Sequence, residues 1–256
     1  ILTVDMNDLN LDFLMALGKL KNVSIKGNAT GKPEGYSILK QPGFEADIEV
    51  KNARLNNSPI GNAYLYSTWD RENKELQASG TFIDGKDTVA LANGVYIPAK
   101  DSIDFIYDAH RLNLGFLTSW LSSFSKEVTG LGTGKVRMFG KTKAVGFEGS
   151  VFAENGNLSV EYLKTSYSFT DSVYLTRKSI ALKNITVYDE EKNRGYLNGL
   201  ITHDGTFNNM KYDLKINARN MLALNTQPRD NEFFYGKAYA SGNVNIYGNM
   251  ANIYID

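Results

Sequence analysis

The sequence repeats itself at one constant spacing, which limits the chain to folds built from stacked copies of one unit. Short motifs recur in the same order 103 residues further along: Leu9–Leu14 as Leu112–Leu117, Gly27–Lys32 as Gly130–Lys135, Gly43–Glu45 as Gly146–Glu148, and Asn52–Leu55 as Asn155–Leu158. A third copy begins near Lys215, since Gly242–Gly248 resembles Gly134–Gly140. The predicted organisation is a first repeat over 1–105, a second over 106–213 and the start of a third over 214–256.

Within the repeats, apolar and polar residues alternate with a period of two. The longest run is Met210–Ala218, in which Tyr212, Leu214 and Ile216 alternate with charged or amide side chains. Successive side chains of a strand point to opposite faces of a sheet, so this pattern predicts strands with one apolar and one solvated face. The 23 glycines against 5 prolines suit strands joined by glycine turns. The fold is therefore predicted to be all-β.

Two short segments have helical spacing instead. Near residues 9–20, Leu9, Phe13 and Leu17 lie four apart, and residues 112–124 carry a similar apolar face. The second segment lacks the Lys- and Arg-rich polar face of a helix that lies on a membrane. We expect it to cover part of the apolar sheet face as a plug.

The alternation fits two architectures. No Pro- or Ser-rich linker separates the copies, and the strand Ser102–Tyr107 continues directly into the next helical segment. This favours one continuous repeat sheet, in which each copy buries its apolar face beside its neighbours. Tandem β-sandwiches are the alternative, because two facing sheets require the same alternation.

Charge and composition exclude several classes of function. Lysine and arginine total 28, as do aspartate and glutamate, so no net positive field favours nucleic acid. Cysteine is absent, which removes disulfides, thiolate metal sites and thiol nucleophiles. No run of roughly 18 apolar residues is present to cross a membrane as a helix. Both ends of the chain have strand-like sequence, so we expect a piece of a longer protein whose anchor or targeting signal lies elsewhere.

Catalytic and metal-binding patterns are missing from the sequence. The two histidines, His110 and His203, belong to no recognised motif, and no Gly-x-Ser-x-Gly elbow provides a nucleophile. Asp189–Glu191 lacks the spaced ligands and central glycine of a calcium loop and is typical of a solvated hairpin turn. We therefore expect no enzymatic activity, no cofactor and no metal.

The second repeat resembles a known family. Gly132–Gly140, Gly146–Val151 and Gly156–Val160 combine glycine turns with short apolar strands in the manner of the TamB family, the inner-membrane subunit of the translocation and assembly module. Tyr162–Phe169 and Phe234–Gly242 are similar to the form common in Bacteroidetes homologues. The resemblance covers residues 106–256 directly and residues 1–105 through the repeat. These are scaffold motifs, and they carry no active site.

The resemblance implies a long curved sheet, a β-taco or half-pipe, whose concave face is apolar. It implies a periplasmic part of an envelope protein that moves phospholipids between membranes, assists outer-membrane protein assembly, or does both. The full-length protein would be anchored in the inner membrane by an N-terminal helix. Its partners would be phospholipid acyl chains and, through regions outside this sequence, an outer-membrane barrel protein of the BamA/TamA type.

The lipid groove is expected to be lined by apolar residues that alternate with solvated neighbours. Such a surface shields acyl chains from water, each buried methylene contributing about 0.8 kcal/mol. Solvated neighbours are expected at Arg137, Glu161, Asp213 and Lys215. The predicted groove residues are Val136, Met138, Val151, Leu158, Val160, Tyr212, Leu214, Ile216, Val244 and Ile246.

Aromatic residues support an alternative from another functional class. Tyr64, Tyr66 and Trp69 lie close together in the sequence and are the kind of side chains that stack on sugars. The alternative is therefore a β-sandwich surface adhesin or glycan-binding module. Aromatic residues on strands are also common as cross-strand partners that stabilise a sheet.

Overall fold

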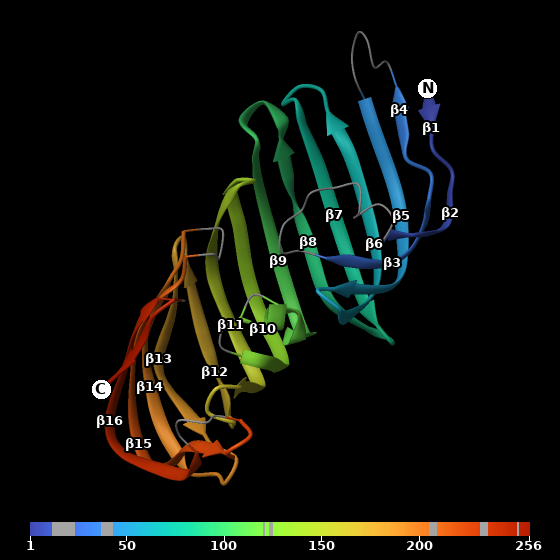
Figure 1. Cartoon of the computed structure of the whole chain (residues 1–256). Helices are drawn as coiled ribbons and strands as arrows, with labels where there is room; N and C mark the ends of the chain where they lie inside the picture. The colour runs from blue at the N-terminus through green and yellow to red at the C-terminus, as the bar shows by residue number, and fades with distance from the viewer. Residues whose placement is uncertain are drawn as a thin grey trace. The chain divides into compact units, whose positions relative to one another are not determined.

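The computed structural model describes residues 1–11, 24–36, 43–119, 121–122, 125–204, 209–230, 235–249 and 251–256. Within these residues the fold is all-β, with 17 strands in one sheet (Figure 1). The strands are β1 (Leu2–Thr3), β2 (Met6–Asn10), β3 (Ile25–Gly31), β4 (Glu34–Tyr36), β5 (Gly43–Leu55), β6 (Ser58–Asp70), β7 (Glu75–Asp84), β8 (Asp87–Ile97), β9 (Ser102–Asn113), β10 (Ser125–Lys141), β11 (Ala144–Val160), β12 (Thr165–Thr176), β13 (Ser179–Tyr188), β14 (Arg194–Thr202), β15 (Lys211–Thr226), β16 (Gly236–Asn249) and β17 (Ile253–Ile255). Two 3₁₀ helices, η1 (Pro98–Lys100) and η2 (Leu114–Ser119), interrupt them.

The sheet is an antiparallel meander. Consecutive strands pair with each other from β5 through β9 and again from β11 through β17. β10 pairs with both β9 and β11. At the N-terminal edge, β1 pairs with β4 and β2 pairs with β3. Both β3 and β4 then pair with β5. The predicted continuous sheet is therefore confirmed, and the tandem-sandwich alternative is wrong.

The chain divides into two compact units. Unit 1 comprises residues 1–113 and 134–147, and unit 2 comprises residues 114–133 and 148–256. This division does not test the repeat boundaries predicted near residues 105 and 213, which stay a prediction.

β-Bulges interrupt alternate strands at asparagine residues. Asn52 in β5, Asn155 in β11, Asn184 in β13 and Asn220 in β15 all have φ near +50°, the left-handed region in which asparagine is tolerated best after glycine. The register shifts at each of them. In each case the asparagine N–H donates to a side-chain oxygen on the next strand, namely that of Asn62, Thr170, Asn198 and Ser241 respectively. A bulge bends its strand and increases the local twist.

The bulges occur at positions that the repeat makes equivalent. Asn52 and Asn155, 103 residues apart, have the same φ of 51°. Gly27 and Gly130 have φ of 137° and 124°, and a Cβ on either would lie 2.8 Å from the backbone of the following bulged strand. Gly31 and Gly134 both lie in strands. The matches at Gly27/Gly130 and at Asn52/Asn155 thus correspond to similar local structures.

Within each unit the sheet curls at one end of its strands. In unit 2, β12 and β15 are three strand spacings apart, which is about 14 Å in a flat sheet. Nevertheless the Tyr167 hydroxyl of β12 donates to the Leu222 carbonyl of β15 at 2.8 Å. In unit 1 the Ser58 hydroxyl of β6 likewise donates to Asn113 Oδ1 of β9 at 3.3 Å.

Each unit has its own small core on the inside of this curl. In unit 1 it comprises Ala29, Val50, Ala53 and Ala63. In unit 2 it comprises Ile185, Val187, Ala218 and Met221. Both cores include residues that flank the asparagine bulges, so the bulged strands bend towards the apolar face. We call this face the inner face of each unit, and the opposite one the outer face.

The first predicted helix is largely untested, since Leu11 is helical and the residues after it are not described, whereas the second is shorter than predicted. Leu9 and Asn10 belong to strand β2, and most of the first segment, residues 12–20, lies outside the described residues. In the second, strand β9 extends to Asn113, and only the short 3₁₀ helix η2 follows. Trp120 and residues 123–124 lie outside the described residues. In the second segment, apolar residues three or four apart are compatible with a strand end or a short helix.

Candidate functional site

The inner face of unit 2 carries continuous apolar rows. Residues paired in antiparallel register place their side chains on the same face, so the strand registers give the rows directly. One row crosses seven strands and contains Val151, Val173, Leu182, Gly199, Leu214, Ile246 and Ile255. The next contains Gly149, Leu175, Ile180, Ile201, Tyr212 and Gly248, and a third contains Ile185, Leu197, Ile216 and Val244.

Most of these side chains are only half-buried. Val151, Leu182, Leu214 and Ile246 all have intermediate exposure, whereas Tyr212 is buried. In a sandwich, a second sheet would cover such a face and bury these residues completely. Here the apolar rows remain accessible from one side.

Gly199 shapes the middle of the longest row. Its φ is +156°, and a Cβ there would lie 2.3 Å from the Asp213 carbonyl oxygen and 2.8 Å from Leu214 Cδ2. Any larger residue would therefore displace Leu214. The absence of a Cβ at Gly199 leaves room for the Leu214 side chain beside it.

Eight of the ten predicted groove residues lie in unit 2. Val151, Leu214 and Ile246 share the longest row, Ile216 and Val244 are paired in the third, and Tyr212 lies in the second. Leu158 and Val160 lie beyond the Asn155 bulge, where they pair with Tyr167 and Thr165. The structure thus brings the predicted residues of β15 and β16 together. It places Leu158 and Val160 apart from them, towards the curled end of the sheet.

The other two, Val136 and Met138, lie in the part of β10 that belongs to unit 1. Between them Arg137 makes a bidentate pair with Asp104 of β9, with Nε–Oδ1 and Nη2–Oδ2 distances of 2.8 and 2.6 Å. The Arg137 hydrogen bonds hold the pKa of Asp104 below its usual value. Because alternate residues face opposite ways, this outer-face ion pair turns Val136 and Met138 inward.

Unit 1 has inner rows of its own, with smaller side chains. One contains Ile48, Leu65, Gly80, Ala92 and Tyr107, and another contains Ala29, Val50, Ala63, Phe82, Ala90 and Ala109. Burial raises the pKa of the Tyr107 hydroxyl, which lies among these apolar groups.

The η2 segment lies against the inner face at the first part of β10. The Thr118 hydroxyl accepts from Val128 N–H at 3.0 Å and so attaches the segment to β10. Leu114 occupies the space above Gly132, where a Cβ would lie 2.7 Å from Leu114 Cδ2 and 3.1 Å from Val151 Cγ1. This part of the predicted plug therefore covers one end of the longest row.

The solvated neighbours lie on the outer face or in turns. Arg137, Asp213 and Lys215 are exposed in their strands, and Glu161 is exposed in the turn after β11. There Glu161 pairs with Lys164, whose hydrogen bond lowers the pKa of Glu161.

The aromatic residues of β6 do not form one platform. Tyr64 and Tyr66 are exposed on the outer face, where their hydroxyls donate to Glu49 and Glu45 at 3.4 and 3.1 Å. The hydrogen bond to Glu45 raises the pKa of Tyr66. Trp69 is an odd number of residues away, so the strand turns it to the other face, where it pairs with Leu76. The structure thus separates the three residues that the sequence brings close.

Asp189 differs from the expectation of a solvated turn. It is 1% exposed, and its carboxylate accepts from Glu191 N and Asn193 N at 2.9 Å, from Asn193 Nδ2 at 3.0 Å and from Leu222 N at 2.7 Å. Burial by itself would raise the pKa of Asp189, but these hydrogen bonds outweigh it and the pKa is lowered. Asp189 therefore joins the β13–β14 turn to the far part of β15.

The two histidines have different surroundings. His203 is buried just after β14, its N–H donating to the Lys178 carbonyl at 2.9 Å, and burial lowers its pKa. His110 is exposed in β9, 3.5 Å from Asp108. Among the described residues, no three His, Cys, Asp or Glu side chains gather as a set of metal ligands.

Comparisons with protein-family models, curated proteins and solved structures find no match to this chain. The resemblance to the TamB family therefore rests on the sequence motifs alone. In the part of the chain that the structure describes, no helix has the length and apolar character needed to cross a membrane.

Proposed function

We propose that this chain is a periplasmic part of a TamB-like envelope protein and that its inner face carries phospholipid acyl chains between membranes. The observation that carries the proposal is the longest apolar row of unit 2, which crosses seven strands from Val151 to Ile255 and is not covered by a second sheet. Acyl chains would lie on these rows, and the polar head groups would remain in solvent.

Physical chemistry supports an apolar cargo. An exposed apolar patch of this continuity is unfavourable in water and marks a binding surface in most soluble proteins. Each methylene that moves from water onto the rows contributes up to about 0.8 kcal/mol. Movement of an acyl chain along such a face needs no chemical step. It needs only that successive strands bind the acyl chain with similar affinity.

The same face suits the second role implied by the family resemblance. Assistance in outer-membrane protein assembly would use the apolar rows to shield the lipid-facing side chains of an unfolded barrel strand. The BamA/TamA-type barrel partner would act through regions outside this sequence. We rank lipid transport first because half-exposed rows on successive strands form a path as well as a contact surface.

A single substitution on the longest row tests the proposal. Leu214→Asp places a carboxylate between Gly199 and Ile246, where an acyl chain would have to pass. Because the row is accessible to water, the charge stays solvated and the sheet should remain folded. We expect photo-crosslinking of a diazirine-labelled phosphatidylethanolamine to the purified chain to fall about tenfold, an effect of about 1.4 kcal/mol.

Phe152→Asp is the matched control, because Phe152 is 45% exposed on the outer face of β11. It makes the same kind of change, from a large apolar residue to aspartate, on the opposite side of the same unit. Crosslinking should stay at the wild-type level, and circular dichroism should give cooperative melts for both variants. Equal crosslinking by wild type and a folded Leu214→Asp variant would contradict the transport proposal.

A further inference from the structure

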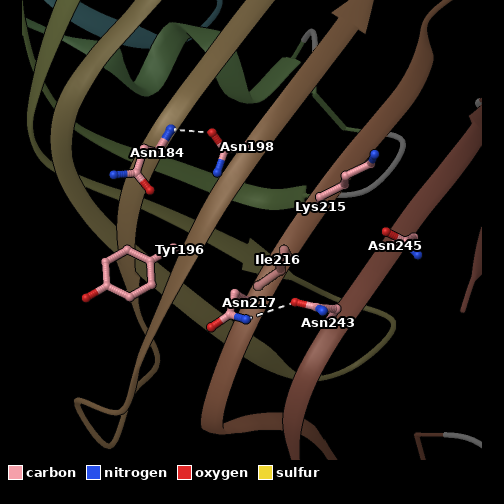
Figure 2. A pocket seen from close by; sticks show the side chains of 8 residues that line it. All are labelled: Asn184, Tyr196, Asn198, Lys215, Ile216, Asn217, Asn243 and Asn245. Carbon is pink, nitrogen blue, oxygen red and sulfur yellow. Dashed lines mark hydrogen bonds between the residues drawn. The ribbon is translucent and has the colours of Figure 1, made fainter.

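The outer face of unit 2 has a hollow in which five of the eight lining residues are asparagines. It has a volume of about 720 Å³, within the range of sites that hold small ligands. Figure 2 shows the lining side chains on four neighbouring strands, β13 to β16. The lining residues are Asn184, Tyr196, Asn198, Lys215, Asn217, Asn243 and Asn245, with Ile216, which lies between Lys215 and Asn217 on β15 and belongs to the third inner-face row.

Strand register assembles the polar groups in two rows. Lys215 is paired with Asn198 on one side and with Asn245 on the other. Asn217 is likewise paired with Tyr196 and Asn243. These are outer-face positions, because they alternate along β15 with the inner-face Leu214 and Ile216.

The bulge explains only two of the five asparagines. Asn184 has φ of +51°, and its N–H donates to Asn198 Oδ1 at 2.7 Å. The same pair is formed in unit 1 by Asn52 and Asn62, at 3.0 Å. In unit 1, however, the residues in register with Asn62 are Ile83 of β7 and then Thr88 of β8, neither of which is an asparagine.

The remaining three asparagines are not required by a bulge. Asn217, Asn243 and Asn245 are exposed in strand interiors, where asparagine is unfavourable. Asn217 Nδ2 donates to Asn243 Oδ1 at 2.9 Å (Figure 2), and within the described residues the Asn245 amide makes no hydrogen bond of its own. Residues that oppose the local strand propensity are expected at functional positions.

The chemistry of the hollow favours a neutral, oxygen-rich ligand. Each amide offers two donors and an acceptor, which matches hydroxyl groups that both donate and accept. Tyr196 adds a half-buried ring beside them. Lys215 is the only charged residue of the lining, too little positive charge for a polyanion.

We propose that this hollow binds an uncharged saccharide. The amides of Asn217, Asn243 and Asn245 would hold its hydroxyl groups, and Tyr196 would lie against the ring. The site is on the face opposite to the apolar rows, so it is independent of the acyl-chain proposal.

The test measures saccharide binding by isothermal titration calorimetry. The purified chain is titrated with chitotetraose, cellotetraose and maltotetraose, and with a sulfated tetrasaccharide. We expect at least one neutral tetrasaccharide to bind, and the Asn217→Ala/Asn243→Ala double variant to lose about tenfold in affinity or more. Asn93→Ala is the matched control, since Asn93 is an exposed strand asparagine on the outer face of unit 1.

Three results would overturn the proposal. In the first, no neutral tetrasaccharide binds, and in the second, wild type and the folded double variant bind equally well. In the third, only the sulfated tetrasaccharide binds, and Lys215→Gln abolishes that binding. Leu214→Asp should bind the saccharide as wild type does, so a failure of the lipid proposal leaves this one standing. Circular dichroism checks that each variant is folded.

Discussion

At the scale of single residues, the buried carboxylate of Asp189 is the most consequential polar group in unit 2. Its two oxygens accept four hydrogen bonds, two each, from groups that would otherwise be partly buried without a partner. Asp70, at the end of β6, accepts similar local bonds from Glu72 N, Asn73 N and Asn73 Nδ2 and one from Gln77 Nε2 of the adjacent β7, but among the described residues it accepts none from a strand beyond β7.

Asp189→Asn should lower the free energy of unfolding by about 3 kcal/mol, because an amide replaces only one of the two accepting oxygens. Asp70→Asn should lower it by less than about 1 kcal/mol, since the turn is solvated. Urea denaturation monitored by circular dichroism measures both. Equal losses in the two variants would show that the Asp189 bond to Leu222 contributes nothing.

The contribution of Asp189 should also depend on pH. Its folded pKa is lowered, so its stabilisation is fully present above the unfolded value of about 3.9 and is lost as the pH falls through the folded pKa. The difference in unfolding free energy between wild type and Asp189→Asn should therefore be constant from pH 7 to about pH 5 and shrink towards pH 2. A difference that stays constant down to pH 2 would exclude ionisation of Asp189 as its source.

The sequence contained a signal for the local hydrogen bonds of Asp189, namely its spacing from an asparagine. Asp70 and Asp189 each precede an asparagine by three or four residues at a hairpin turn, the spacing at which a carboxylate accepts from the turn backbone. The additional bond to Leu222 depends on the curl of unit 2, which brings distant strands together. No local pattern predicts that contact.

At the scale of elements, the alternation of apolar and polar residues predicted the strands but did not predict the bulges that bend them. The run from Met210 to Ala218 has the expected exposure at nearly every position. The alternation then shifts phase at Arg219–Asn220, as it does at Lys51–Asn52 and Lys183–Asn184. A charged residue followed by asparagine within an alternating run was therefore the available signal for a bulge.

The glycines opposite the bulges give a test of repeat equivalence. Gly27→Ala and Gly130→Ala should each cost about 3 kcal/mol, because both positions have φ that favours glycine and a Cβ 2.8 Å from neighbouring backbone atoms. Gly85→Ala should cost only about 1 kcal/mol, since Gly85 has φ of +62° but open space around it. Thermal denaturation compares the three variants. A large difference between Gly27→Ala and Gly130→Ala would contradict their equivalence.

At the scale of the whole molecule, the described residues form two small cores and leave a large area of half-buried apolar surface. The most strongly buried apolar residues include Ala29 and Val50 in unit 1, and Ile185 and Leu222 in unit 2. Stability is therefore expected to be uneven along the strands, highest near the bulges and lowest at the strand ends away from the curl.

Hydrogen exchange followed by mass spectrometry should locate two separate regions of slow exchange. We expect them at the β3–β6 core around Ala29–Ala63 and at the β13–β15 core around Ile185–Met221. The outer ends of the same strands should exchange at least about tenfold faster, because fewer buried side chains oppose their opening. Uniform protection along β5 and β15 would show that the cores do not dominate stability.

The meander topology also affects how the chain can fold while it is being synthesised. Because strands from β5 onward bond to their neighbours in sequence, the hydrogen-bonded strand pairs are close along the polypeptide, and such local pairing favours faster folding than distant pairing does. Each completed strand is a template for the one that follows. The protein can thus fold progressively during synthesis, from the N-terminus onward, without waiting for its C-terminal residues.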